Sequence, residues 1–207
     1  PEAQTSYDLW IYQLQQAEAA LPFRTNAYVF DQMSAIHTFF PQLLIAFHRV
    51  DDAADLEAYV ARIRESGRAV RQLIEISKRN VVAGVRPPRF AFDFVIDQST
   101  KIITGAPFDK SGTDSAVWAD VKAKVADFQK KGTLDEAKAS ALLEEARAAL
   151  TGPFRTAYQD LIDWQKEDRL SAPEKTSGVG VLPNGAAYYR ERLANQTTTS
   201  MSADEIH

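Results

Sequence analysis

The stretch from Ala53 to Ala83, AADLEAYVARIRESGRAVRQLIEISKRNVVA, has the clearest helical pattern in the sequence. Its apolar residues recur every three or four positions, which places them on one face of an α-helix. At 1.5 Å per residue, this helix is about 45 Å long. A helix of that length must pack along several neighbours to cover its apolar face, so the stretch predicts a helical core. The residues of this apolar stripe are Leu56, Tyr59, Val60, Ile63, Gly67, Val70 and Ile74.

Helical patterns also fill most of the remaining chain, and glycines and prolines separate them. Gly84 ends the long helix, Pro87-Pro88 delays the next one, and Gly152-Pro153 predicts a kink. Thr133 and Glu136 have the spacing of a capping box. The predicted helices cover 5–20, 31–38, 41–47, 53–83, 89–103, 115–131, 133–165 with its kink, and 186–195.

The fold class predicted from these patterns is all-α, with several long packed helices and a short β or turn segment near residues 178–185. The sequence shows no internal repeat and no linker between domains. We therefore expect residues 1–207 to form one helical segment, in which residues 171–207 are candidates for a turn and helix that line a cleft. Because the sequence begins with Pro1 and stops where a further helix starts, it has the character of a piece of a longer protein.

Composition narrows the function classes. Lys and Arg total 24 against 28 Asp and Glu, for a net charge of −4, so no basic surface for nucleic acid is expected. No run of about 18 apolar residues is present, and no membrane-spanning segment is predicted. The absence of cysteine excludes disulfides, thiolate zinc sites and cysteine nucleophiles.

A search for catalytic patterns gives no site within this sequence. The three histidines are His37, His48 and His207, and none belongs to a His-Glu-x-x-His motif. Gly-x-Ser-x-Gly, Walker and complete dinucleotide motifs are also missing. Adjacent carboxylates such as Asp51-Asp52 are expected to be solvated or to cap helices. The sequence predicts no catalytic and no metal-ligating residue here.

The stretch from Gly178 to Tyr189 carries the most distinctive residues. Its glycines permit close approach of another backbone, and a short strand at 179–182 could accept a peptide at its edge. Tyr188 and Tyr189 point about 100° apart on a helix, so one can pack while the other reaches solvent or a ligand. A structural turn and the wall of a cleft both remain open. The aromatic-rich region 23–47 similarly fits either a core or a pocket.

Several segments resemble the bacterial family called DUF885. They include Pro22-Phe-Arg, Gln32-Met-Ser-Ala-Ile-His-Thr, Gly84-Val-Arg-Pro-Pro and, above all, Gly180-Val-Leu-Pro-Asn-Gly-Ala-Ala-Tyr-Tyr. They occur in order along nearly the whole chain. Where family members often carry glycine before His37, this sequence has Ala35-Ile36.

The resemblance implies a mostly helical, zinc metallopeptidase-like protein similar to gluzincins. In such proteins, two histidines and a glutamate hold Zn, and the Glu of His-Glu-x-x-His is the general base. In the family this motif follows the Leu-Pro-x-Gly-x-x-Tyr-Tyr stretch, so zinc is expected in the parent protein and not in this chain. The resemblance makes this stretch the candidate substrate-binding segment, with residues Leu182, Pro183, Asn184, Gly185, Tyr188 and Tyr189.

The resemblance therefore predicts a non-catalytic helical scaffold portion of a zinc-dependent peptidase. The expected partners are the remainder of the parent chain and a peptide substrate, and the family suggests a periplasmic or lipid-anchored location. The first alternative is a self-contained helical binding module with an aromatic pocket around 23–47. The second is a truncated product with no function of its own. A piece of a larger protein should expose an apolar patch, which we expect along 53–83 or 186–195.

Overall fold

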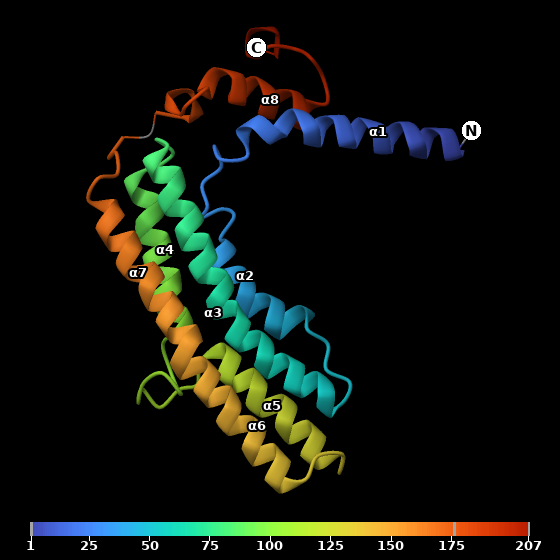
Figure 1. Ribbon diagram of the computed structural model, residues 1–207, viewed down its shortest axis with the longest axis vertical. Coiled ribbons are helices and arrows are strands. Elements are labelled where there is room, and N and C mark those ends of the chain that lie inside the picture. Colours follow the sequence, from blue (N-terminus) through green and yellow to red (C-terminus); the bar gives the residue numbers. More distant parts are fainter. Residues whose placement is uncertain (1, 176, 207) are drawn as a thin grey trace. The chain divides into compact units, whose positions relative to one another are not determined.

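The computed structural model describes residues 2–175 and 177–206, and it is all-α, as predicted (Figure 1). No strand occurs within these residues, where β-structure is limited to an isolated bridge between Ala106 and Asp114. The α-helices are α1 (Glu2–Ala20), α2 (Ile36–Gln42), α3 (Ala53–Val82), α4 (Arg89–Ile102), α5 (Ala116–Lys130), α6 (Glu136–Ala149), α7 (Arg155–Arg169), α8 (Gly185–Thr197) and α9 (Ala203–Ile206). Single turns of other helix types are the 3-10 turns η1 (Leu21–Phe23) and η4 (Val179–Val181) and the π turns η2 (Leu43–Phe47) and η3 (Leu150–Phe154).

The chain divides into two compact units. Unit 1 comprises Pro1–Tyr28, Lys78–Arg86 and Lys175–His207. Unit 2 comprises Val29–Ser77 and Pro87–Glu174. Each unit therefore combines segments that are distant in the sequence, and the long helix α3 contributes residues to both.

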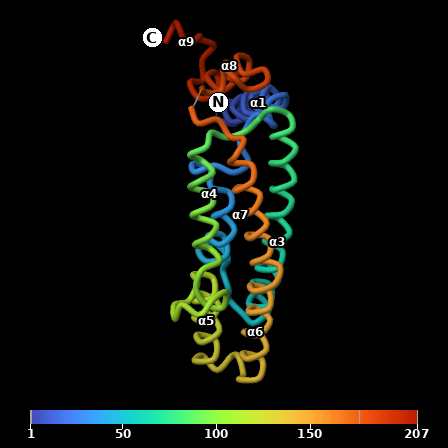
Figure 2. The backbone as a smooth tube through the Cα atoms, turned by 90° about the vertical axis from the view of Figure 1, so that its left-hand side faces the viewer, coloured from blue at the N-terminus to red at the C-terminus, as the bar shows by residue number. Residues whose placement is uncertain are grey.

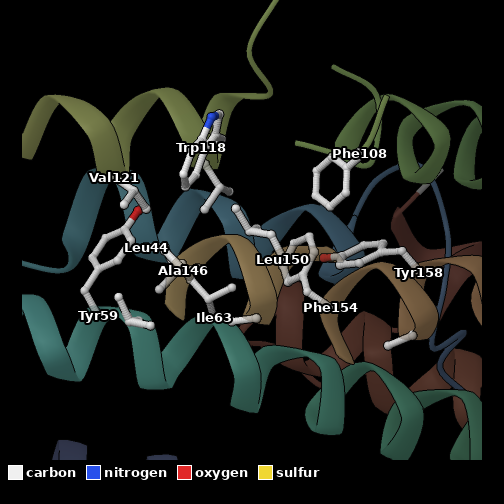
Figure 3. Close-up of a cluster of buried hydrophobic side chains, with 14 of the residues drawn as sticks. Leu44, Tyr59, Ile63, Phe108, Trp118, Val121, Ala146, Leu150, Phe154 and Tyr158 are labelled. Atoms are coloured by element: carbon white, nitrogen blue, oxygen red, sulfur yellow. The ribbon is translucent and has the colours of Figure 1, made fainter. Parts of the chain in front are cut away.

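Unit 2 is a helical bundle whose core follows the stripe predicted on α3. All seven stripe positions are buried, and Ile63 and Val70 are completely inaccessible to solvent. α4 and α7 pack against each other, and so do α5 and α6 (Figures 1 and 2). Figure 3 shows the central cluster, to which α3 contributes Tyr59 and Ile63. The cluster also includes Leu44, Phe108, Trp118, Val121, Ala146, Leu150, Phe154 and Tyr158.

The predicted kink lies at the π turn η3, between α6 and α7. Gly152 leaves helical geometry there, with φ −93° and ψ −107°. The kink brings the backbone of Pro153 against α3, where a Cβ on Gly67 would lie 2.5 Å from the Pro153 carbonyl oxygen. Gly67 is thus required by the close approach of two backbones, which explains a glycine in the middle of a long helix.

A second backbone problem in the core is solved by Tyr158. The residue four positions after His37 in α2 is Pro41, which has no N–H to donate to the His37 carbonyl. The Tyr158 hydroxyl donates a 2.6 Å hydrogen bond to that oxygen instead. Both residues are fully buried. The bond therefore satisfies an acceptor that water cannot reach.

Two local expectations are corrected. The segment 179–182 is not a strand: Gly178 has a φ of 66°, and the Leu182 N–H bonds to the Val179 carbonyl at 3.1 Å, closing a 3-10 turn. The expected capping box at Thr133 is also wrong. The N-cap of α6 is Asp135, whose carboxylate accepts from the Lys138 N–H at 2.8 Å. The carboxylate of the later residue satisfies the free N–H groups at this end, so the helix starts later.

Candidate functional site

The candidate segment Leu182–Tyr189 belongs to unit 1, where it forms the turn that begins α8. The Gly185 N–H bonds to the Leu182 carbonyl at 2.8 Å. Asn184 is the N-cap of α8 in the left-handed conformation, with φ 56°. Leu182 is buried, whereas Pro183 and Asn184 are exposed. The segment is therefore a compact turn with a buried leucine.

Contacts from two other segments of unit 1 hold this turn. The side-chain amide of Asn26, itself 6% exposed, donates a 2.7 Å hydrogen bond to the Pro183 carbonyl. A Cβ built on Gly84 would lie 3.5 Å from Cγ of Pro183, so the proline ring stands over that glycine. The Pro183 backbone is thus tied to the segment that follows α1, and its ring to the end of α3.

Glycine is required at position 185 because there is no room for a Cβ atom, and not because of its φ angle. A Cβ at this position would lie 2.3 Å from the Val179 carbonyl oxygen and 2.7 Å from the carbonyl of Gly180. Real Cβ atoms do not approach a backbone so closely. The first turn of α8 can therefore pack on η4 only with glycine at 185.

The two adjacent tyrosines diverge, as their helical spacing predicts. The Tyr188 ring packs against Phe23, with 5.9 Å between the ring centroids. Tyr189, the next residue along the helix, is 46% exposed. Of the two, Tyr188 is the one placed beside another element, and Tyr189 is free to contact solvent or another surface.

A pocket of about 210 Å³ lies between the C-terminal end of α1 and α8, which run side by side (Figures 1 and 2). Tyr188 is the member of the candidate segment that lines it. Small side chains leave the space open, and charged side chains stand among them. The lining residues are Ala17, Ala20, Leu21, Phe23, Arg24, Ala27, Tyr188, Glu191 and Arg192.

The charges of this pocket are unevenly paired. Arg192 binds Glu191 through two hydrogen bonds of 2.6 Å, and the Glu191 side chain is only 8% exposed. These hydrogen bonds raise the pKa of the Arg192 guanidinium. Arg24 forms no side-chain hydrogen bond or ion pair within the part of the chain that the structure describes. The pocket lining thus carries one carboxylate and two guanidinium groups.

Glu191, Arg192 and Arg24 are not among the site residues predicted from the sequence. A signal for two of them was present, because positions 188, 191 and 192 share one face of a helix at spacings of three and four. No sequence pattern indicates Arg24 or the lining alanines, since they line the pocket only because α1 packs against α8.

The aromatic region 23–47 does not act as one element. Phe23 belongs to unit 1 and lines the pocket just described. Phe30 is buried in the core of unit 2, whereas Phe39 and Phe47 are 43% and 66% exposed. Of the aromatic residues in region 23–47, Phe23 thus lines a pocket, and Phe30 belongs to the core of unit 2.

The imidazoles of His37 and His48 each contact a polar side chain of a neighbouring helix. His37 Nε2 lies 2.7 Å from Oε1 of Gln98, and burial lowers the pKa of this imidazole. His48 Nδ1 lies 2.6 Å from a guanidinium nitrogen of Arg62, and burial lowers its pKa as well. His207 lies outside the described residues. Within residues 2–175 and 177–206, no group of three or more His, Asp or Glu side chains could hold a metal ion.

Two carboxylates from the adjacent acidic pairs accept hydrogen bonds from backbone N–H groups at the start of a helix. The Asp52 carboxylate accepts from the Asp55 N–H at 2.9 Å, at the start of α3. The Glu205 carboxylate accepts from the Ser202 N–H at 2.7 Å, and this bond lowers its pKa. Both carboxylates thus stabilise helix N-termini, as predicted for the Asp51-Asp52 pair.

The fold defines an all-α protein in which helices of the two termini form one unit and the intervening helices form a bundle. The chain belongs to the DUF885 family, described as "Bacterial protein of unknown function (DUF885)", which matches residues 1–207. No curated protein matches the chain.

One solved structure with a similar fold is described as "the putative lipoprotein from Colwellia psychrerythraea". The two share a TM-score of 0.76 at 15% sequence identity, over 87% of this chain. The matched region is 29% of the Colwellia chain, so this chain spans less than a third of that protein's length. Among the described residues, none of the helices has the length and apolar character needed to cross a membrane.

Proposed function

We propose that this chain is the non-catalytic helical scaffold portion of a zinc-dependent peptidase of the DUF885 family. Peptide-bond hydrolysis is then an activity of the longer parent protein, and the remainder of that protein is the partner of this portion. The observation that carries the scaffold role is an uncovered apolar face on α1, taken together with a structural relative about three times as long.

The uncovered face of α1 consists of Tyr7, Trp10 and Leu14, which are 58%, 59% and 42% exposed. Their spacing of three and four residues places them on one side of the helix. None of the residues described for α1 is buried. A contiguous row of large apolar side chains in water is typical of a surface that another element covers.

This face is not where the sequence predicted an apolar patch. On α3, Ile76 and Val82 are the large apolar side chains with substantial exposure among those described, and on α8 it is Tyr189. The long helix directs its apolar stripe into unit 2, so its outer side is mainly polar. The terminal helix α1 carries the patch instead.

The residues described here do not fit a zinc site, because no suitable group of ligands comes together. The proposal therefore places the zinc ligands and the general base in the remainder of the parent chain, as the family resemblance implies. No catalytic step is assigned to this portion.

The turn from Leu182 to Tyr189 is proposed to lie along the substrate cleft of the parent protein. Its rigid attachment through Asn26 and Gly84 suits a wall that must keep its position when a peptide binds. Tyr189 offers an exposed aromatic ring for that contact. A lipid-anchored or periplasmic location is part of the same proposal, supported by the description of the Colwellia relative.

The test compares this chain with the longer parent protein. Leu14→Asp should change the free energy of unfolding of the chain alone by no more than about 0.5 kcal/mol, because the side chain is exposed. In the parent, the same substitution should cost about 2 kcal/mol or more, because it removes a buried leucine and buries a charge. Gln13→Asp, at a neighbouring exposed position, is the matched control.

Equal effects of Leu14→Asp in the two proteins would contradict the covered-face assignment. The proposed peptidase activity is tested separately, by the zinc content and the peptide hydrolysis of the parent protein. The purified parent should contain about one zinc per chain by elemental analysis and should hydrolyse peptides, with loss of activity on chelation. A parent without zinc and without hydrolysis would refute the peptidase role, whatever the result for Leu14.

A further inference from the structure

We propose that the pocket between α1 and α8 binds a small carboxylate carried on an aromatic or branched apolar group. This site lies wholly within unit 1. It does not depend on zinc or on peptide hydrolysis, so it goes beyond the function proposed above.

The size of the pocket suits one such group. Its volume of about 210 Å³ exceeds the roughly 150 Å³ of an apolar cavity that can hold benzene. Three of the nine lining residues are alanines, Ala17, Ala20 and Ala27, and a larger side chain at these positions would reduce the space. A ring with a short substituent therefore matches the room available.

The apolar part of the lining favours an aromatic occupant. Phe23 and Tyr188 pack with 5.9 Å between centroids and an interplanar angle of 37°, so they form an aromatic wall. Aromatic rings gain from offset or edge contacts with such a pair beyond the area that they bury. Leu21, 59% exposed, stands at the same pocket with surface left to cover.

The charges select a carboxylate over a neutral or cationic group. Glu191 and Arg192 neutralise each other through their two hydrogen bonds. Arg24 keeps an uncompensated positive charge, with no partner among the residues that the structure describes. A guanidinium binds a carboxylate through two parallel hydrogen bonds, which a carboxamide cannot reproduce.

Two sources carry this chemistry: a free small acid, and the C-terminal residue of a peptide. N-acetyl-L-phenylalanine represents the shared group, and N-acetyl-L-phenylalaninamide is its uncharged counterpart. We would titrate each into the ¹⁵N-labelled chain and follow the amide signals of residues 17–27 and 188–192. The acid should bind saturably and about tenfold more tightly than the amide, since charged hydrogen bonds are about twice as strong as neutral ones.

Variants assign the preference to the pocket. Arg24→Gln should remove the preference for the acid, and Arg190→Gln, an exposed arginine of α8 outside the lining, should leave it intact. Ala20→Leu should abolish binding of both ligands by filling the pocket. Ala19→Leu adds the same side chain at an exposed position outside the lining and should bind like the unmodified chain.

Equal binding of acid and amide, an equal effect of the two arginine variants, or no saturable shift at these residues would overturn the proposal. The Arg24 substitution is at an exposed position, so its result does not depend on whether Ala20→Leu still folds. N-acetyl-Gly-Gly-Phe distinguishes the sources. Tighter binding of this tripeptide than of the free acid assigns the pocket to peptide C-termini, and weaker binding assigns it to free acids.

Discussion

Gly67→Ala tests whether the kink between α6 and α7 determines the packing of the long helix. On helix propensity alone, alanine in the interior of α3 should stabilise the chain by about 1 kcal/mol. The structure predicts the opposite sign. The new Cβ would lie 2.5 Å from the Pro153 carbonyl oxygen, 2.8 Å from its carbonyl carbon and 3.2 Å from the Phe154 nitrogen.

The magnitude follows from what would have to move. A comfortable contact needs about 3.5 Å, so the backbone at Pro153 must retreat by roughly 1 Å. All three atoms belong to the backbone, and Phe154 is fully buried, so a rotation of a side chain cannot relieve the clash. Overpacking of this kind costs about 1–3 kcal/mol. We take the upper end, about 3 kcal/mol, and subtract the gain in propensity, which leaves a loss of about 2 kcal/mol.

Urea and thermal unfolding followed by circular dichroism provide the measurement. A loss of about 2 kcal/mol corresponds to a decrease of roughly 4–8 °C in Tm for a chain of this size. Gly180→Ala is the control, because a Cβ there has no atom within 4 Å, and it should change stability by less than about 0.5 kcal/mol. A Gly67→Ala chain as stable as the unmodified one, or more stable, would refute the close approach of these backbones.

Three further predictions concern buried groups. Tyr158→Phe should cost about 1–3 kcal/mol, because it leaves the His37 carbonyl unpaired, whereas Tyr189→Phe should have no effect on the same unfolding curve. Burial lowers the pKa of His37 in the folded chain, so the unfolded chain takes up a proton first as pH falls below about 6.5. The free energy of unfolding should therefore decrease from pH 7 to pH 5. His37→Gln should make that decrease smaller. Gly185→Ala should speed amide hydrogen exchange in α8, because its Cβ would collide with the Val179 carbonyl; unchanged exchange would show that the turn adapts without cost.

The bundle could be predicted because its signals are local and agree with one another. The seven-residue stripe of α3 repeats at helical spacing, and the same face is the one buried. Gly152-Pro153 predicted the kink because proline removes a helical hydrogen bond wherever it occurs. The choice of glycine at 67 could not be explained in advance, since its cause is a backbone that lies 86 residues further along the chain.

The errors arose where several local solutions have similar energies. Val179, Gly180 and Val181 suit a strand by composition, but the packing of Gly185 against them selects a 3-10 turn. At the start of α6, Thr133 and Asp135 are both good caps, and the one that reaches a free N–H in the folded backbone is Asp135. Residue propensities predict the possible local structures and caps, and tertiary contacts determine which of them forms.

The pocket and the uncovered face both depend on α1, which has apolar residues on more than one side. Tyr7, Trp10 and Leu14 lie on one side of the helix, and the same spacing of three and four residues continues to Ala17 of the pocket lining. The half-buried Tyr12 lies about 200° from Leu14 at 100° per residue. The uncovered face and the pocket therefore occupy successive parts of α1: the pocket uses its C-terminal end, beside α8, and the face nearer the N-terminus is available to a partner. If that is correct, Leu14→Asp should leave binding of N-acetyl-L-phenylalanine to the chain unchanged, and Ala20→Leu should abolish it.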